Sequence, residues 1–318
     1  MSATAVGAAG GVPAAGARSV LVLAHTGRPE AVTALTQVVR RLHDAGVRTL
    51  MTPEEARALS VSDRRLVAER DLEGAVEGAE MVIVLGGDGT ILRAAELVRG
   101  TSTTLLGVNL GHVGFLAEAE REEVVGTVSR VVAGDYRVEE RMTLDVEVVL
   151  DGEVVARSWA VNEVSVEKGN RERMIEVVVD VDGRPLSTFG GDGVIAATPT
   201  GSTAYAFSAG GPVVWPEVEA LLVVPISAHA LFARPLVIAP TSSVGVEVLP
   251  SLDDGGVVWC DGRRTFAAPT GARVEVRRSA QRVRLARLST GIFTDRLVAK
   301  FGLPVHGWRG PRAAADGA

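Results

Sequence analysis

The sequence has only one cysteine, Cys260, and no excess of basic residues. A lone cysteine excludes an internal disulfide framework and a cysteine metal cluster, and it is typical of a reducing compartment. The formal net charge is -6, which excludes the basic footprint expected for general binding to nucleic acid. No spacing of His, Cys or carboxylate residues indicates a structural metal site.

Long uninterrupted apolar runs are also missing. The most apolar stretch, residues 221–240, contains three prolines together with His229 and Arg234, so it cannot form one membrane-spanning helix. Residues 1–18 are rich in Ala and Gly but lack the basic start and the bulky apolar segment of a signal peptide. We therefore expect a cytoplasmic protein with a disordered tail at residues 1–18 and a second tail at residues 310–318.

The sequence does contain enough apolar side chains for a large core. Hydrophobic residues make up 47% of the 318 residues, which predicts a globular chain with room for two domains. From residue 19 to residue 137, strand-like apolar runs alternate with helical periodicity, and this pattern predicts an α/β, Rossmann-like domain with a parallel sheet. Pro29 near the start and Gly46 just past the end delimit its first helix. Ligands of such sheets bind at the carboxyl ends of strands, where two glycine-rich turns fall.

Residues 138–289 have a different pattern, in which Val and Thr alternate with polar residues. The pairs Asp151-Gly152 and Asp182-Gly183 lie between alternating runs and predict hairpin turns. This region is therefore predicted to be an all-β, sandwich-like domain with one short helix, for which Ser202 is the expected N-cap. Residues 290–309 have helical spacing and are expected to return and pack on the first domain.

The first glycine-rich turn, Gly86–Thr90, contains an unexpected acid. Residues 82–85 are apolar, and apolar residues return at helical spacing from Ile91 onward, which predicts a strand, a glycine turn and a helix. Such a junction directs backbone N–H groups and the positive end of a helix at an anion, and an acid placed there repels phosphate. Asp88 therefore either caps the helix, or binds a metal or moves a proton. The residues alone leave these interpretations open.

Three further stretches carry candidate polar residues. The loop at residues 109–116 is by itself interpreted as a tight connection in which His112 is a loop side chain. Asn162-Glu163 directs two polar side chains to opposite faces of a strand, which by itself favours a strand edge or a bulge. Residues 190–208 hold many small and hydroxyl-bearing residues that could recognise a ribose or a base, with Tyr205 as a stacking face. Serine-threonine loops usually only cap helices, so this stretch is not decisive alone.

Together and in this order, four strings resemble the NAD kinases: GGDGT at 86–90, NLGHVGFL at 109–116, NE at 162–163 and GDGVIAATPTGSTAYAFSAGGP at 191–212. SAHALFARPLVI at 227–238 and CDG at 260–262 extend the likeness, which covers residues 19–309. GGDGT alone is a weak signal, because phosphofructokinases and diacylglycerol-type lipid kinases also carry it. The TPTGSTAY segment with its upstream GDG is much more specific.

The resemblance implies a kinase that transfers a terminal phosphoryl group to the 2′-hydroxyl of the adenosine ribose of NAD and so makes NADP. The implied donor is ATP, another nucleoside triphosphate or polyphosphate, used with Mg²⁺, and NADH is a further acceptor to test. No tightly bound organic cofactor is expected. The resemblance also implies a homo-oligomer, a dimer or a tetramer, with the NAD site between the domains and near a neighbouring subunit, and no nucleic-acid or membrane partner.

Roles of individual residues follow from the same resemblance. The aspartate that matches Asp88 is taken in the family as the base, or the positioning group, for the 2′-hydroxyl, and Gly87 and Gly89 let it approach the ribose. The expected NAD contacts are Asp88, Gly89, Arg93, Asn162, Glu163, Arg173, Asp192, Thr203, Ala204, Tyr205 and Ser208. The expected contacts to the donor phosphates are Gly86, Gly87, Gly89 and Thr90. Asp261 belongs either to the site or only to a hairpin turn.

One position departs from the family pattern. Many relatives have Arg where this chain has Gly190, so we expect more room and one fewer fixed charge at the nicotinamide end, and hence weaker discrimination between NAD⁺ and NADH. The alternatives are another kinase with GGDGT, acting on a lipid or a sugar phosphate, and a nucleotide-binding sensor without catalysis. The downstream GTxND and TIDND-like elements of those kinases are missing from the sequence, and the presence of Asp88 argues against a sensor.

Overall fold

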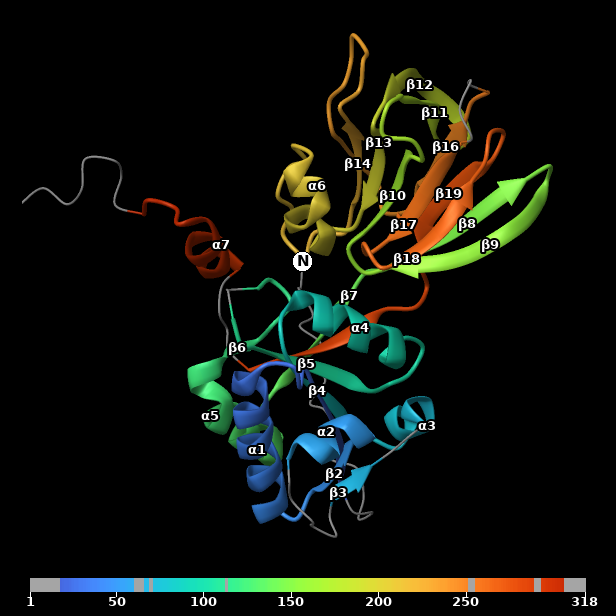
Figure 1. Cartoon of the computed structure of the whole chain (residues 1–318). Helices are drawn as coiled ribbons and strands as arrows, with labels where there is room; N and C mark the ends of the chain where they lie inside the picture. Colours follow the sequence, from blue (N-terminus) through green and yellow to red (C-terminus); the bar gives the residue numbers. More distant parts are fainter. Residues whose placement is uncertain are drawn as a thin grey trace, which may run out of the picture. The chain divides into compact units, whose positions relative to one another are not determined.

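The computed structural model describes residues 18–59, 66–68, 71–111, 114–250, 255–288 and 293–305. Contacts within the chain divide it into two compact units (Figure 1), each of which is described by itself. Unit 1 comprises residues 1–139 and 285–318, and unit 2 comprises residues 140–284. His112 and the two predicted tails, apart from Arg18, lie outside the described residues.

Unit 1 is built on an eight-stranded sheet whose order is β3-β2-β1-β4-β5-β20-β7, with β6 paired to β5. The pairs β1/β2, β1/β4, β4/β5 and β20/β5 are parallel. The strands are β1 (Ser19–Ala24), β2 (Arg48–Met51), β3 (Leu66–Ala68), β4 (Met81–Leu85), β5 (Thr104–Asn109), β6 (Ala119–Glu120), β7 (Arg137–Arg141) and β20 (Val283–Arg287). The helices are α1 (Pro29–Asp44), α2 (Pro53–Ala58), α3 (Leu72–Glu77), α4 (Asp88–Val98), η1 (Arg121–Glu123), α5 (Val124–Ala133) and α7 (Phe293–Phe301).

The core of unit 1 determines where its strands end. Strand β4 is buried along its whole length, as expected for a parallel strand that is covered on both faces. Helix α1 starts with Pro29, and Gly46 follows its end with φ +74°, as predicted. The apolar face of α1, which includes Leu35 and Val38, shares one hydrophobic core with β4 and α5. The two glycine-rich turns follow the carboxyl ends of β4 and β5.

Unit 2 consists of two six-stranded sheets, ordered β15-β14-β13-β10-β17-β18 and β12-β11-β16-β19-β8-β9. The strands are β8 (Leu144–Leu150), β9 (Glu153–Ala160), β10 (Glu163–Lys168), β11 (Ile175–Val181), β12 (Arg184–Gly191), β13 (Gly193–Ala197), β14 (Leu221–Ile226), β15 (Leu236–Ile238), β16 (Ser243–Val248), β17 (Gly256–Cys260), β18 (Arg264–Ala268) and β19 (Arg273–Arg278). Two short helical turns, η2 (Thr200–Thr203) and α6 (Tyr205–Ser208), follow β13.

The two sheets of unit 2 enclose one core, to which Val146 and Val177 of one sheet and Val166 and Val258 of the other contribute. Buried and less buried residues alternate along β8, as expected for a sandwich strand with one inward face. The α/β architecture followed by an all-β sandwich is therefore confirmed.

The hairpin turns of unit 2 also form where the sequence predicts them. Asp151 and Asp182 take positive φ values of 51° and 55°, and a glycine with positive φ follows each of them. Antiparallel strands pair on either side of both turns. These two Asp-Gly pairs are thus turn residues between strands.

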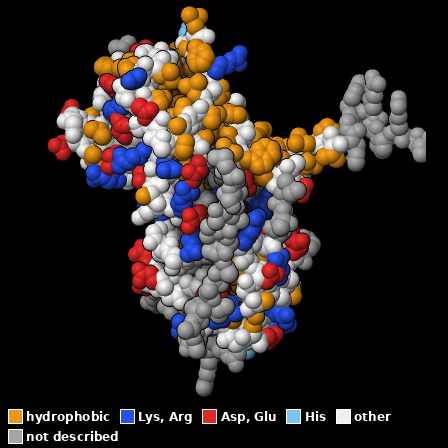
Figure 2. All heavy atoms as spheres, turned by 180° about the vertical axis from the view of Figure 1, so that it is seen from behind, with side chains coloured by type: hydrophobic (Ala, Val, Ile, Leu, Met, Phe, Trp, Pro, Cys, Tyr) orange, Lys and Arg blue, Asp and Glu red, His pale blue; other side chains and the backbone are white. Residues whose placement is uncertain are grey.

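Several of the exposed large apolar side chains of unit 2 lie in or next to one connection between strands. The connection between β14 and β15 carries Leu231 and Phe232, both of which are exposed, and Val237 of β15 is exposed beside them. Figure 2 shows hydrophobic side chains gathered over this unit. Exposed apolar patches are typical of interaction sites.

Two local predictions differ from the structure. Strand β20 lies within the range predicted for the β domain, but it pairs with β5 of unit 1 through Leu285 and Leu105. Its alternating sequence is like that of the preceding strands, so the pattern does not say which sheet it joins. Ser202 does not cap the short helix, whose N-cap is Ala204; its hydroxyl donates to the carbonyl of Val214 and accepts from the amide of the same residue.

Helix α7 lies in the segment predicted to return to the first domain, and its Phe293 and Phe301 rings lie 5.6 Å and 6.0 Å from the Phe115 ring. No helix among the described residues is long and apolar enough to span a membrane.

Candidate functional site

Asp88 stands at the first position of α4, directly after the turn that ends β4. Its side chain makes no capping bond to its own helix, whose N-cap is Gly87. Its two carboxylate oxygens instead accept hydrogen bonds from the amides of Phe115 (3.1 Å) and Leu116 (3.2 Å). Of the two readings of Asp88, helix capping is therefore wrong.

The loop after β5 is more than the tight connection suggested by its sequence, because it supplies both of these amides. A Cβ atom added to Gly114 would lie 2.3 Å from Oδ1 of Asp88, so no larger residue fits there without displacing the carboxylate. Gly86 is similarly constrained, since an added Cβ would lie 2.7 Å from Oγ1 of Thr90. The two glycine-rich loops are thus two parts of one structure around Asp88.

The turn before α4 presents backbone amides, but not all of those that were expected. The amide of Gly86 donates to the carbonyl of Val108 at 3.0 Å, and the amide of Thr90 donates to that of Gly87 at 2.9 Å. Both of these amides are engaged within the chain. Contacts of Gly86 and Thr90 to the donor phosphates stay a prediction. In the described part of the chain, no backbone carbonyl accepts from the amides of Gly87, Asp88 or Gly89. These three amides lie at the positive end of an 11-residue helix.

In unit 2, Asn162 and Glu163 do not form a strand edge or bulge. Both are buried, and β10 begins at Glu163. The carboxylate of Asp261 accepts hydrogen bonds from the amides of Val161 (2.9 Å) and Asn162 (2.7 Å), and it pairs with Arg264 at 2.9 Å. Asp261 therefore does more than complete a turn, because it holds the backbone that presents Asn162 and Glu163.

The environment of Glu163 favours its neutral form. Burial and the neighbouring Asp261 carboxylate raise the pKa of Glu163 to about 8, and a hydrogen bond from the amide of Tyr205 (3.3 Å) acts in the opposite direction. Burial also raises the pKa of Asp261 above its ordinary range. A carboxyl group that is protonated near neutral pH can donate a hydrogen bond as well as accept one.

The TPTGSTAY segment folds closely around Asn162 and Glu163. Thr198 donates to the carbonyl of Val161 from its hydroxyl (2.6 Å) and to that of Asn162 from its amide (2.9 Å). A Cβ atom added to Gly201 would lie only 2.1 Å from the carbonyl oxygen of Asn162, which explains why a glycine stands there. The structure therefore brings Asn162, Glu163 and Tyr205 together. Thr203 and Ala204 directly precede Tyr205 in the chain.

Asp192 has a partner that the sequence analysis did not identify. Lys168 lies 2.6 Å from Oδ1 of Asp192, and the hydrogen bonds from Lys168 and Ser227 hold the pKa of this carboxyl below its usual range. Burial raises the pKa of the Tyr205 phenol, and the nearby carboxylates of Glu167, Asp192 and Glu163 raise it further. Glu167 is next to Lys168 in β10. The only sequence signal for Lys168 was its place in the strand that begins at Glu163.

The remaining predicted residues are more loosely connected to these clusters. Arg93 is exposed on α4, Ser208 is exposed at the end of α6, and Arg173 is exposed in the turn between β10 and β11. Gly190 has space beside it, because an added Cβ would meet Met174 only at 3.6 Å, an ordinary contact. Among the described residues, no group of three or more His, Cys, Asp or Glu side chains could hold a metal ion.

Comparisons with known proteins match both units in chain order. The family model of the ATP-NAD kinase N-terminal domain matches residues 20–136, and that of the ATP-NAD kinase C-terminal domain matches residues 161–288. The chain is 60% identical over 296 residues to the NAD kinase of Leifsonia xyli subsp. xyli, with 92% of this chain and 97% of the relative covered. It is 52% identical over 306 residues to the NAD kinase of Mycobacterium tuberculosis, with 92% and 98% covered.

Solved structures have the same fold. A crystal structure of an NAD kinase from Archaeoglobus fulgidus in complex with ATP aligns with a TM-score of 0.66 at 25% identity, covering 89% of this chain and 98% of that one. A crystal structure of yeast NADH kinase complexed with NADH aligns with a TM-score of 0.83 at 22% identity, covering 91% and 88%. Because its identity is only 22%, the likeness to the yeast structure supports the fold alone.

Proposed function

The chain belongs to the ATP-NAD kinase family and is a phosphotransferase that acts on NAD, and we propose that Asp88 is the group that accepts the proton of the attacking 2′-hydroxyl. The observation that carries this role is the pair of hydrogen bonds from Phe115 and Leu116, which hold both carboxylate oxygens at a glycine-rich helix N-terminus. The carboxylate accepts a hydrogen bond from the 2′-hydroxyl, orients its oxygen toward the terminal phosphorus and takes its proton as the new P–O bond forms. The products are NADP and the donor that has lost its terminal phosphoryl group.

The amides of Gly87, Asp88 and Gly89 are the proposed donors of hydrogen bonds to the phosphates of ATP. They face no backbone acceptor within the described residues, and the dipole of α4 favours negative charge at its N-terminus. Mg²⁺ enters with ATP as part of the substrate, where it neutralises phosphate charge.

Unit 2 supplies the proposed contacts to NAD. Neutral Glu163 and the buried Asn162 offer hydrogen bonds to the polar edges of a nucleotide, and the partly exposed ring of Tyr205 offers a stacking surface. Thr203, Ala204 and Ser208 contribute the adjacent backbone and hydroxyls. Asp192, held by Lys168, is proposed to face a ribose hydroxyl, and Arg93 and Arg173 are proposed cationic contacts to the substrate.

We further propose that the protein acts in the cytoplasm as a homo-oligomer. The observation that supports self-association is the exposure of the apolar residues Leu231, Phe232 and Val237 in and next to the connection between β14 and β15. Sedimentation of the purified chain tests this, and Phe232→Glu is expected to shift it toward the monomer. A protein that is monomeric at every accessible concentration would contradict the oligomer.

The test of the function is a direct assay. Purified protein is mixed with NAD⁺, ATP and Mg²⁺, and NADP⁺ is detected with an NADP-specific dehydrogenase, with NADH or polyphosphate substituted in parallel reactions. NADP⁺ formation from ATP is expected, and the parallel reactions then rank acceptors and donors. Binding of NAD without formation of NADP from any donor would overturn the proposal and favour a nucleotide-binding sensor.

A further inference from the structure

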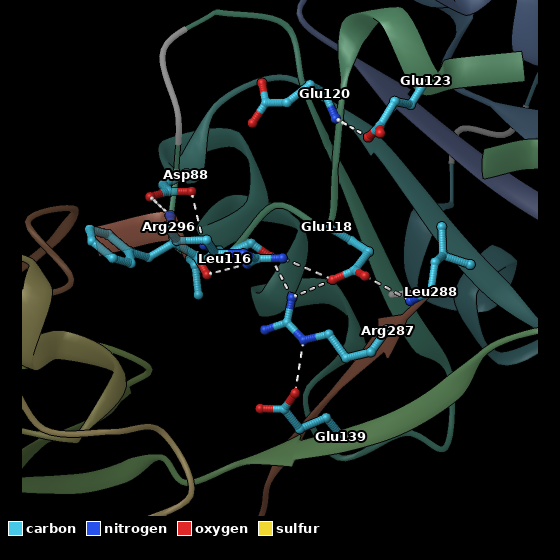
Figure 3. A network of polar contacts seen from close by, with 10 residues as sticks. Asp88, Leu116, Glu118, Glu120, Glu123, Glu139, Arg287, Leu288 and Arg296 are labelled. Atoms are coloured by element: carbon cyan, nitrogen blue, oxygen red, sulfur yellow. Dashed lines mark hydrogen bonds and ion pairs between the residues drawn. The ribbon is translucent and has the colours of Figure 1, made fainter. Parts of the chain in front are cut away.

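One of the two peptide groups that hold Asp88 is itself held from the other side. Phe115 and Leu116 each direct an amide to the Asp88 carboxylate. The carbonyl of Phe115 accepts a hydrogen bond from Arg296 of α7 at 3.0 Å, and the carbonyl of Leu116 accepts a longer one from Arg287 at 3.5 Å. The peptide group that joins Phe115 to Leu116 therefore lies between a carboxylate and a guanidinium group, because its N–H binds Asp88 and its carbonyl binds Arg296. The Leu116 carbonyl that binds Arg287 belongs to the next peptide group along the loop. Figure 3 shows Asp88, Arg296, Leu116 and Arg287 close together.

A single buried acid joins the two arginines. The Glu118 side chain is only 2% exposed, and its Oε2 atom accepts from Arg287 at 3.1 Å and from Arg296 at 3.0 Å. Its other oxygen accepts from the amide of Leu288 at 2.8 Å, and Arg287 also pairs with Glu139 at 2.9 Å. Two acids thus balance two guanidinium groups, so the cluster is a network with compensated charges rather than an isolated buried ion.

Helix α7 adds apolar contacts at the same place. The rings of Phe293 and Phe301 flank the Phe115 ring at centroid distances of 5.6 Å and 6.0 Å. Helix α7 therefore contacts both the carbonyl and the side chain of the residue whose amide binds Asp88. These contacts join a helix near the end of the chain to a loop about 180 residues earlier in the sequence.

We infer that Arg296 is a positioning residue for Asp88, which acts through the peptide group between Phe115 and Leu116 and, with Glu118 and Arg287, sets the orientation of the carboxylate. This inference rests on the proposed role of Asp88. An arginine bound to the carbonyl of Phe115 fixes the plane of that residue's backbone and polarises the hydrogen-bonded chain that ends at the carboxylate. Because small misplacements of a catalytic group reduce turnover strongly, Arg296 acts on kcat without touching substrate.

The variant that tests this is Arg296→Met, which keeps an apolar stem and leaves Glu118 paired with Arg287. We expect kcat to fall by about 10- to 100-fold, with the KM for NAD changed by less than about 2-fold. Lys300→Met is the matched control, because Lys300 is a basic residue on the exposed side of the same helix, and its kcat is expected to be that of the unsubstituted chain.

The decisive comparison adds Arg296→Met to Asp88→Asn. If Arg296 acts through Asp88, the second substitution lowers the remaining turnover by less than about 2-fold, because the group that it positions is already lost. A full further loss in the double variant, or an unchanged kcat in Arg296→Met alone, would overturn the inference. Wild-type turnover in Asp88→Asn would instead overturn the proposed function, so the two failures are distinguishable.

A folding defect is separated from a positioning defect by Arg296→Lys. A lysine at this position keeps the charge and the stem, but its single ammonium cannot reproduce the fork that reaches Phe115 and Glu118 together. We expect a melting temperature close to that of the unsubstituted chain and a kcat lowered by about 3- to 10-fold. A normal kcat in this folded variant would contradict the need for the Phe115 contact.

Discussion

The two units hold their key carboxyl groups in opposite ways. In unit 1, Asp88 is partly exposed and both of its oxygens are bound by backbone amides from a neighbouring loop. In unit 2, Glu163 is buried next to a second acid, Asp261, and receives one amide from Tyr205. Backbone donors keep a carboxylate ionised and oriented, so that it can accept a hydrogen bond, whereas burial without a cation favours a neutral carboxyl group that can also donate one. We therefore propose two different tasks for the same chemical group, according to its surroundings.

The largest expected effect comes from removing the acceptor in unit 1. Asp88→Asn keeps the size of the side chain but cannot take a proton, so kcat is expected to fall by a factor on the order of 10² to 10⁴. Steady-state kinetics measure kcat, and calorimetry measures NAD affinity, which is expected to change little. Asp151→Asn is the matched control, because Asp151 is also followed by a glycine but lies in a hairpin turn. Comparable losses in both variants would mean that Asp88 has no special role.

A smaller effect is expected when the support of Asp88 is changed and Asp88 itself is left intact. The Cβ of Gly114→Ala would fall within 2.3 Å of the carboxylate, so the side chain must move away from the amides that hold it. We expect kcat to fall by about 10- to 100-fold while the melting temperature changes little. In Gly111→Ala the nearest atom to the new Cβ is 3.9 Å away, and this neighbouring variant is expected to keep its activity. If Gly114→Ala and Gly111→Ala were equally active, the proposal that the amides of this loop hold the Asp88 carboxylate in place would be refuted.

The contrasting environment of Glu163 predicts a dependence of stability on pH. Its pKa is raised from 4.5 to about 8 in the folded chain, so between these values the folded state keeps a proton that the unfolded state has released. The unfolded state then binds fewer protons, and the free energy of unfolding contributed by this group falls as pH rises through that window.

Glu163→Gln removes this titration, so its melting temperature is expected to fall less than that of the unsubstituted chain between about pH 6 and about pH 8.5. Each kcal/mol corresponds to about 2–4 °C for a domain of about 150–250 residues. Thermal melts of both proteins and of Glu176→Gln, a change at an exposed position, provide the measurement. Parallel pH profiles for Glu163→Gln and the unsubstituted chain would show that Glu163 does not keep its proton.

The smallest expected effect concerns acceptor preference near Asp192. Gly190→Arg fits the space beside Met174 and adds a positive charge near the proposed position of the nicotinamide, which is cationic only in NAD⁺. We expect the ratio of kcat/KM for NADH over NAD⁺ to rise by about 5-fold, as for an exposed charge pair worth about 1 kcal/mol. Gly190→Met provides a neutral side chain of similar length. Equal ratios in all three proteins would contradict a role for this position in acceptor choice.

Local patterns predicted the elements of both units, because each pattern depends on neighbours in the chain. The β4 strand, the glycine turn and helix α4 follow from apolar periodicity and from glycine between the two runs. The two Asp-Gly hairpins follow from the positive φ values that such turns require. Predictions failed where a partner is distant: β20 joined the sheet of unit 1, and Ser202 bonded to Val214 instead of capping a helix.

The sequence by itself determined the family, the two-unit architecture and the identity of the acid in the glycine turn, because these are encoded in residue order and spacing. Only the tertiary structure decided what that acid does with its oxygens, since the amides of Phe115 and Leu116 lie 27 and 28 residues away from Asp88. It also decided that Arg296 reaches the same loop, and that Lys168 meets Asp192. Hydrogen bonds and ion pairs depend on distances in space, and residue spacing alone does not specify them across a folded chain.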